Sequence, residues 1–296
     1  MGNSNLGSDE KDQKRAKTEA ALNGIKNLPL IPKVMFEVTK FLQEPAPTTS
    51  GLAKLIGKDQ GLTTKILSVA NSPLYGLQRK VTSLEFAIIV LGFKEIRDVV
   101  TAISLAEAIN VASDRYFNQV DFWVHSMVVG SAAKGISQNL GFMDIASDAF
   151  VAGMLHELGI QLLHKFMHPQ FVEICQKVQT EGICFLEAES EVLGMTHQDV
   201  GRFLAEKWNL PVMLCDTLKY HHSPGKTAKG NLLASLVHLA DFMTQKLQVA
   251  NVYWDNNMEL DKEIINTLQF NSEEHLEKFI QDYRDLFTET TFSVRI

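Results

Sequence analysis

The segment Asp148–Leu163, DAFVAGMLHELGIQLL, constrains the fold most, because its pattern predicts a helix that is apolar on every side. A helix without a polar face is normally buried in the protein interior. This segment nevertheless carries His156 and Glu157 next to each other near its middle. A buried carboxylate is costly unless it is paired, hydrogen-bonded or bound to a metal. The fold must therefore bring a partner to this pair inside the core.

Helical patterns recur along the rest of the chain. Apolar residues repeat at helical spacing in segments that are separated by Pro, Gly and Asn, and no convincing strand pattern interrupts them. Capping signals agree with this periodicity, since Thr82 and Glu85 have capping-box spacing and Thr196 precedes the helical pattern HQDVGRFLAEKW. The sequence therefore predicts an all-α protein.

Changes in composition divide the chain into four predicted parts. Residues 1–18 are polar and charged, which predicts a disordered tail. A polar break at residues 111–120 predicts a boundary between an N-terminal helical subdomain, residues 19–115, and a helical core, residues 116–248. The polar helical patterns of residues 249–296 predict a C-terminal helical extension.

Charge and cysteine content exclude several classes of function. The chain has 28 Lys plus Arg against 35 Asp plus Glu, and a net charge of -7 disfavours direct nucleic-acid binding. The cysteines Cys175, Cys184 and Cys215 show no CxxC spacing and are expected to be reduced. No apolar run approaches the roughly 20 residues that a membrane-spanning helix requires, and the N-terminus lacks the apolar segment of a signal peptide. We expect a cytoplasmic protein without a membrane partner.

Several other ionisable residues also occupy apolar helical patterns. His125 lies in FWVHSMVV, Asp241 lies in LVHLADFM, His197 opens a predicted helix, and His221 and His222 end another. Imidazole nitrogens and carboxylate oxygens are ligands of iron, manganese, nickel and zinc. Helical bundles build metal sites from helices that each project one or two such groups inward. The pattern therefore makes these residues candidate metal ligands together with His156 and Glu157.

Each position also has an ordinary structural interpretation. His125 or His197 alone could be a core histidine that hydrogen bonds satisfy, and Asp241 could cap a helix or pair with Lys or Arg. His221 and His222 could form an exposed helix end before Ser-Pro-Gly. More polar surroundings predict a surface position for three further histidines: His164, His168 and His275.

Common catalytic motifs are absent from the sequence. A zinc-protease HExxH motif needs a second histidine four residues after the first, but Ile160 lies four residues after His156. The sequence also has no phosphate-binding glycine loop, no GxSxG motif and no convincing Cys–His pair. No residue can therefore be assigned a catalytic role from motifs.

The order of the candidate ligands resembles the HD superfamily of metal-dependent phosphohydrolases. In order it is most similar to the HD-GYP branch, which cleaves cyclic di-GMP at a centre of two or three metals. Blocks over about residues 25–245 resemble the HDOD family, the HD-related output domain of bacterial signalling proteins: NLPLIPKV, GLTTKILSVANSPLYG, VTSLEFAIIVLGFKEIRDVV, FWVHS, AFVAGMLHELG, LGMTHQDVGRFLAEKWNLP and YHHSP. The resemblance implies an N-terminal helical bundle packed on an HD-like helical core.

The sequence departs from the hydrolases at three places. His156-Glu157 stands where HD hydrolases have His-Asp, and Ile160 stands where the HD-GYP branch has Lys. Ser223-Pro224-Gly225 follows the histidine pair where that branch has an acidic residue and Gly-Tyr-Pro. Many HDOD proteins have lost their metal ligands and are regarded as regulatory modules. The resemblance therefore implies a bacterial signalling module that binds metal without turnover, and other signalling proteins as its partners.

The expected site is one or two transition-metal ions, with iron or manganese favoured and nickel or zinc as alternatives. The expected ligands are His125, His156, Glu157, His197, His221, His222 and Asp241. We expect Glu157 to bridge a first ion and a second ion held by three of the histidines. The alternative function is a metal-dependent phosphohydrolase that acts on a nucleotide or cyclic dinucleotide.

Overall fold

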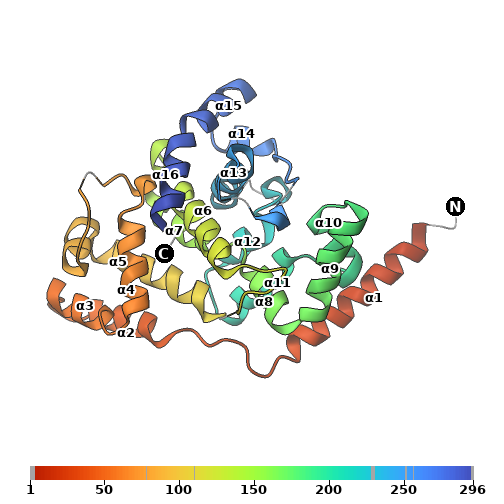
Figure 1. Ribbon diagram of the computed structural model, residues 1–296, viewed down its shortest axis with the longest axis horizontal. Helices are drawn as coiled ribbons and strands as arrows, with labels where there is room; N and C mark the ends of the chain where they lie inside the picture. The colour runs from red at the N-terminus through yellow and green to blue at the C-terminus, as the bar shows by residue number, and fades with distance from the viewer. Residues whose placement is uncertain are drawn as a thin grey trace.

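The computed structural model describes residues 4–77, 79–109, 111–227, 231–250, 252–255 and 257–294. Over these ranges it contains helices and no β-strand, so the all-α prediction is confirmed (Figure 1). None of the helices in this part of the chain is both long enough and apolar enough to cross a membrane. The α-helices are α1 (Ser4–Asn23), α2 (Lys33–Leu42), α3 (Thr49–Ile56), α4 (Gln60–Ala70), α5 (Leu84–Ala108), α6 (Gln119–Asn139), α7 (Ala146–Leu155), α8 (Leu158–Phe166), α9 (His168–Glu181), α10 (Phe185–Leu193), α11 (His197–Lys207), α12 (Val212–Tyr220), α13 (Leu232–Leu247), α14 (Glu263–Thr267), α15 (Glu273–Asp282) and α16 (Arg284–Val294). Short 3-10 turns are η1 (Pro73–Tyr75), η2 (Met143–Ile145), η3 (Pro224–Lys226) and η4 (Tyr253–Asp255).

Helix α1 (Ser4–Asn23) covers residues 4–18 of the predicted disordered tail, and residues 1–3 lie outside the described residues. The helix begins at Ser4, and Glu10 pairs with Lys14 across one turn at 2.8 Å. The Thr18 hydroxyl donates to the Leu193 carbonyl at 2.8 Å, which ties α1 to α10. Charged residues at i and i+4 spacing support this helix, and its contact with α10 joins residues that are far apart in sequence.

The helices α2 to α5 form a bundle at one end of the molecule, while α1 lies at the other end beside α9 and α10 (Figure 1). Helix α5 is broken at Gly92, whose φ of 84° is costly for any residue with a side chain. On one side α5 packs against α2, α3 and α4, and on the other it packs against α7. The last helix, α16, returns to the bundle, where the Leu74 N–H donates to the Thr290 hydroxyl at 3.4 Å.

A part-buried polar network joins α5 to the central helices. The Glu95 carboxylate on α5 accepts hydrogen bonds from the Tyr75 hydroxyl at 2.5 Å, from the Ser147 hydroxyl at 3.1 Å and from Lys134 on α6. The Lys134 ammonium also lies 4.0 Å from the centre of the Tyr75 ring. Although burial opposes ionisation, Lys134 holds the pKa of Glu95 below its usual value. Protein groups alone therefore satisfy this part-buried carboxylate.

One hydrophobic core runs through the bundle and the central helices. The division into residues 19–115 and residues 116–248 stays a prediction. Within the core, glycines let helices approach closely. A Cβ atom at Gly153 of α7 would lie 2.7 Å from the Gly130 Cα atom of α6. A Cβ atom at Gly159 of α8 would lie 1.9 Å from the His197 carbonyl oxygen at the start of α11. These contacts bring α6, α7, α8 and α11 together where the candidate ligands lie.

Candidate metal centre

The predicted helix over residues 148–163 divides at its central pair. Helix α7 ends at Leu155 and α8 begins at Leu158, so His156 and Glu157 lie in the turn between them. The prediction of one continuous helix was wrong, because α8 turns away to pack against α11. The expected burial is confirmed, since both side chains are fully inaccessible. The break lets two neighbouring residues contribute to two separate groups of ligand atoms.

The first group contains His125 of α6, His156, Asp241 of α13 and Asp255 of η4, and all four side chains are buried. The Nε2 atoms of His125 and His156 lie 3.2 Å apart. Oδ1 of Asp241 lies 3.4 Å from Nε2 of His125 and 3.8 Å from Nε2 of His156. Oδ2 of Asp255 lies 3.5 Å from Nε2 of His125. One ligand atom from each residue lies within 4.8 Å of all the others.

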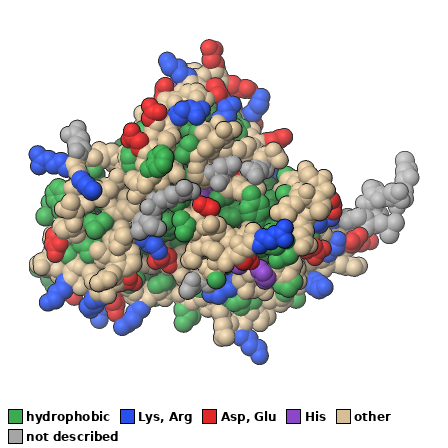
Figure 2. Space-filling model, in the orientation of Figure 1, with side chains coloured by type: hydrophobic (Ala, Val, Ile, Leu, Met, Phe, Trp, Pro, Cys, Tyr) green, Lys and Arg blue, Asp and Glu red, His purple; other side chains and the backbone are tan. Residues whose placement is uncertain are grey.

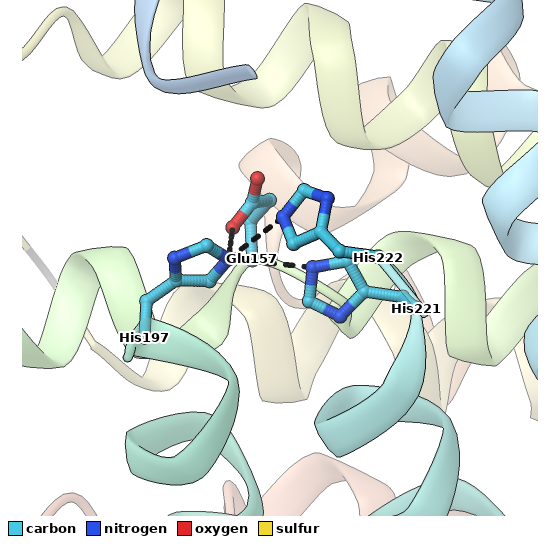
Figure 3. Close-up of side chains that lie close together, drawn as sticks. All are labelled: Glu157, His197, His221 and His222. Carbon is cyan, nitrogen blue, oxygen red and sulfur yellow. Dashed lines mark hydrogen bonds and ion pairs between the residues drawn. The ribbon is translucent and has the colours of Figure 1, made fainter. Parts of the chain in front are cut away.

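The second group contains Glu157, His197, His221 and His222, whose side chains point toward one another in Figure 3. His197 opens α11, while His221 and His222 follow the end of α12. Nε2 of His197 lies 3.3 Å from Oε2 of Glu157, 3.3 Å from Nε2 of His221 and 3.2 Å from Nε2 of His222. Glu157 therefore belongs to the second group in this arrangement.

Backbone carbonyls fix the tautomers of the imidazoles in the first group. Nδ1 of His125 faces the Ala250 carbonyl at 2.9 Å, and Nδ1 of His156 faces the Gly153 carbonyl at 2.6 Å. A carbonyl can only accept, so each Nδ1 carries a proton and the neutral ring has a bare lone pair at Nε2. The two Nε2 atoms face each other at 3.2 Å and require a shared cation or an added proton.

The second group repeats this arrangement with a carboxylate. Nδ1 of His221 donates to the Leu218 carbonyl at 2.8 Å, and Nδ1 of His197 donates to the buried Glu189 carboxylate at 2.9 Å. Although burial lowers the pKa of His197, the Glu189 and Glu157 carboxylates raise it to about 9. A carboxylate behind an imidazole orients metal-binding histidines in many proteins. Glu189 was not identified from the sequence, where it is one acidic residue on a polar helix.

Three buried carboxylates, those of Glu157, Asp241 and Asp255, lack hydrogen-bond partners at both oxygens. Imidazole nitrogens lie 3.3–3.8 Å from them, and no Lys or Arg of the described chain forms an ion pair with them. Burial, followed by the Asp241 and Glu157 charges, raises the pKa of Asp255 well above its usual value. A divalent cation would neutralise these acids and use the imidazole lone pairs, so the donor set fits a transition metal.

Asp255 is the member of the two groups that the sequence did not reveal. It lies at the end of η4 in the C-terminal extension and is 2% exposed. The pattern YWDNN is polar and irregular, and it resembles an ordinary exposed loop. Its role depends on how the chain folds back over α6 after α13, and no local spacing encodes that path.

Two other histidines have structural roles. His238 of α13 donates from Nδ1 to the His221 carbonyl at 2.6 Å and accepts the Asp261 N–H at 2.8 Å, so both of its nitrogens are occupied. His164 was expected at the surface but is only 8% exposed, and its Nε2 contacts Asp114 at 2.9 Å. That carboxylate also accepts two backbone N–H groups, so protein donors already satisfy it.

A surface cavity of about 520 Å³ reaches the centre at His222 and Asp255. Its wall also includes Trp254 and the acidic residues Glu187 and Glu259. Among the described residues that line it, none is Lys or Arg. The approach to the centre is therefore acidic and apolar.

The core is all-helical, and it brings imidazoles and carboxylates from several helices and turns together in two buried groups. The model of the HDOD domain matches residues 28–224, and the chain belongs to the HDOD domain family. The family expected from the sequence is thereby confirmed.

Solved structures share this fold. An HDOD domain protein of unknown function from Geobacter sulfurreducens is 24% identical, with a TM-score of 0.76 over 96% of this chain and 97% of that one. A protein from Shewanella amazonensis SB2B, provisionally described as a phosphohydrolase, is 21% identical, with a TM-score of 0.68 over 93% and 98%. A Marinobacter aquaeolei VT8 protein, provisionally described as a signal transduction protein, is 20% identical, with a TM-score of 0.70 over 97% and 66%. These structural similarities support the all-helical fold and nothing beyond it.

An uncharacterized protein of Treponema pallidum is 21% identical over 265 residues, which make up 89% of this chain. The chain spans about half the length of that relative.

Proposed function

We propose that this protein is a non-catalytic bacterial signalling module of the HDOD family that retains a transition-metal centre. The two groups would hold one or two ions through His125, His156, Asp241 and Asp255 on one side and Glu157, His197, His221 and His222 on the other. The unpartnered carboxylates and the short distances between imidazole Nε2 atoms support a metal. A bound ion would supply positive charge and link helices that are distant in sequence.

The acidic approach to the centre carries the non-catalytic part of the proposal. A phosphate ester is anionic, and sites that process it stabilise its charge with Arg, Lys or metal ions. The cavity at the centre has Glu187, Glu259 and Asp255 in its wall and no described Lys or Arg. On the face in Figure 2, Lys and Arg are dispersed among Asp and Glu without gathering into a basic patch. Ile160 also stands where the HD-GYP branch has Lys.

The donor set favours iron or manganese, with nickel and zinc as alternatives. Each group combines imidazole nitrogens with carboxylate oxygens and contains no thiolate. Cysteine ligands would select soft metals, whereas mixed nitrogen and oxygen sites suit harder divalent ions. The free cysteines lie outside both groups.

The alternative is a metal-dependent phosphohydrolase that acts on a nucleotide or cyclic dinucleotide. The complete set of candidate ligands favours this alternative, because a purely regulatory module would not require two adjacent groups of ligands. In such an enzyme the metals would polarise the phosphate and activate water. This reading requires an anionic substrate to enter the acidic cavity.

The module would signal through other proteins, in a cytoplasmic setting. Its N-terminal block would couple to the rest of the chain beside η1, where the Ser72 hydroxyl lies 3.3 Å from the Thr290 hydroxyl of α16. The Glu95 network links α5 to α6. A change at the centre can therefore reach the bundle through packed helices.

Elemental analysis and turnover assays test the proposal together. Protein purified without chelators should contain iron or manganese and should not hydrolyse cyclic di-GMP or bis(p-nitrophenyl) phosphate after loading with either metal. Turnover that disappears in His156→Ala would establish the phosphohydrolase instead. Absence of any transition metal, before and after reloading, would refute the metal centre.

A further inference from the structure

The segment Val252–Asp255, here called the clasp, crosses the centre from outside the matched family domain, which ends at residue 224. Two aromatic residues anchor it. The Tyr253 hydroxyl lies 2.7 Å from the Cys175 sulfur of α9, and the Trp254 ring stacks on Phe117 with centroids 6.0 Å apart. Val252, Trp254 and Asp255 are all at most 5% exposed. The clasp is therefore a packed part of the core.

The Asp255 carboxylate lies between the two groups of ligand atoms. Its Oδ2 atom is 3.5 Å from Nε2 of His125 in the first group. Its Oδ1 atom is 3.6 Å from Nε2 of His222 in the second group. Neither oxygen has a hydrogen-bond partner. One carboxylate thus presents a free oxygen to each of the two candidate ion positions.

We propose that Asp255 is a metal ligand shared by both groups, so that metal binding stabilises the packed position of the clasp beside the centre. This inference rests on the proposed metal site and assigns Asp255, a member of the first group, to both groups. The position between two ions is where the phosphate of a substrate would have to bind. An internal carboxylate in that position adds negative charge where the phosphate would bind and so opposes anion binding, which agrees with a non-catalytic module.

The contacts of the clasp support a coupling between metal and backbone. Both ring nitrogens of His125 face the chain around the clasp. Its Nδ1 donates to the carbonyl of Ala250, just before the clasp, and its Nε2 faces Asp255 within it. Asp241 and Asp255 are both buried, and their ligand oxygens lie within 4.8 Å of each other. Replacing Asp255 with the neutral Asn removes an acidic group from this cluster and should therefore stabilise the metal-free protein and destabilise the metal-loaded one.

The test compares Asp255→Asn with Glu259→Gln in the full chain. Both substitutions remove one charge from the wall of the same cavity, but Glu259 is exposed and belongs to neither group. Each protein is stripped with EDTA, titrated with Mn²⁺ by calorimetry, and melted with and without Mn²⁺. We expect Asp255→Asn to weaken Mn²⁺ binding by at least about tenfold and Glu259→Gln to bind like the unaltered chain.

The order of the melting temperatures of Asp255→Asn and the unaltered chain should reverse when Mn²⁺ is added. Without metal, Asp255→Asn should melt at or above the temperature of the unaltered chain, and with Mn²⁺ it should melt below. If the unaltered chain binds Mn²⁺ and Asp255→Asn binds it equally well, the clasp proposal is wrong while the metal centre stands. If the unaltered chain binds neither Mn²⁺ nor Fe²⁺, the proposed function and the clasp both fail.

A second measurement needs no variant and covers the case in which Asp255→Asn does not fold. Hydrogen–deuterium exchange of the unaltered chain should show that Mn²⁺ slows exchange at residues 252–255. Amides in the middle of α15, far from both groups in sequence, should exchange equally in both states. Unchanged exchange in the clasp of the Mn²⁺-loaded protein would overturn the proposal.

Discussion

Two regions of this protein place carboxylates away from solvent, one part-buried and one fully buried, and they differ in what surrounds those carboxylates. At the junction of bundle and core, Glu95 is paired with Lys134 and accepts two hydroxyl hydrogen bonds. At the centre, Glu157, Asp241 and Asp255 have no hydrogen-bond partners, and imidazole nitrogens lie 3.3–3.8 Å from their oxygens. The first region contains a Lys that pairs with its carboxylate, whereas no described Lys or Arg pairs with the three carboxylates of the second. A buried carboxylate therefore points to a ligand only when its surroundings leave it unsatisfied.

Removing a ligand from the centre should have the largest effect. His156→Ala should lose most of its bound metal and melt well below the unaltered protein. The stabilisation at stake is about 4 kcal/mol if free metal exceeds its Kd a thousandfold, because metal binds only the folded state. Metal analysis and thermal denaturation measure both changes.

The matched control is His238→Ala, which removes another buried histidine that hydrogen-bonds only to backbone groups. It should lower stability but keep the metal content. Equal metal loss in both variants would contradict the distinction between ligands and structural histidines.

Breaking the junction network should cost stability in a way that EDTA does not change. Glu95→Ala leaves the Lys134 ammonium buried without its partner, and breaking such a pair costs about 3–5 kcal/mol. The double variant Glu95→Leu with Lys134→Met should recover part of that loss. Urea denaturation with and without EDTA checks this, and a Glu95→Ala effect that depends on metal would mean that the two regions are not independent.

The smallest effect concerns pH. The folded-state pKa of Glu95 is lowered, so its contribution to stability is present above the unfolded pKa of about 4.5 and is lost as pH falls through the folded value. In EDTA, the unaltered protein should therefore lose more stability than Glu95→Gln between about pH 4.5 and pH 3. If both proteins lose the same stability over this range, the neighbours of Glu95 do not lower the pKa of its carboxyl group.

The all-α fold and most of the candidate ligands could be predicted from the sequence, because apolar periodicity and the order of histidines are visible in the sequence itself. The buried His156 and Glu157 were predicted from an apolar helix, and the carboxylates and imidazoles chosen with them do lie in two adjacent groups. The break between α7 and α8 was missed, since it depends on the contact of Gly159 with the start of α11. Asp255 was missed because chain path, and not spacing, brings it to the centre.

Protein purified without chelators and melted before and after EDTA treatment tests the central claim most directly. The account predicts that iron or manganese copurifies at one or two ions per chain and that EDTA lowers the melting temperature by several degrees. Restoring the metal should restore the original temperature. If no transition metal copurifies, none binds on reloading and EDTA leaves the melting temperature unchanged, the unpartnered carboxylates are satisfied by protons and the metal centre does not exist.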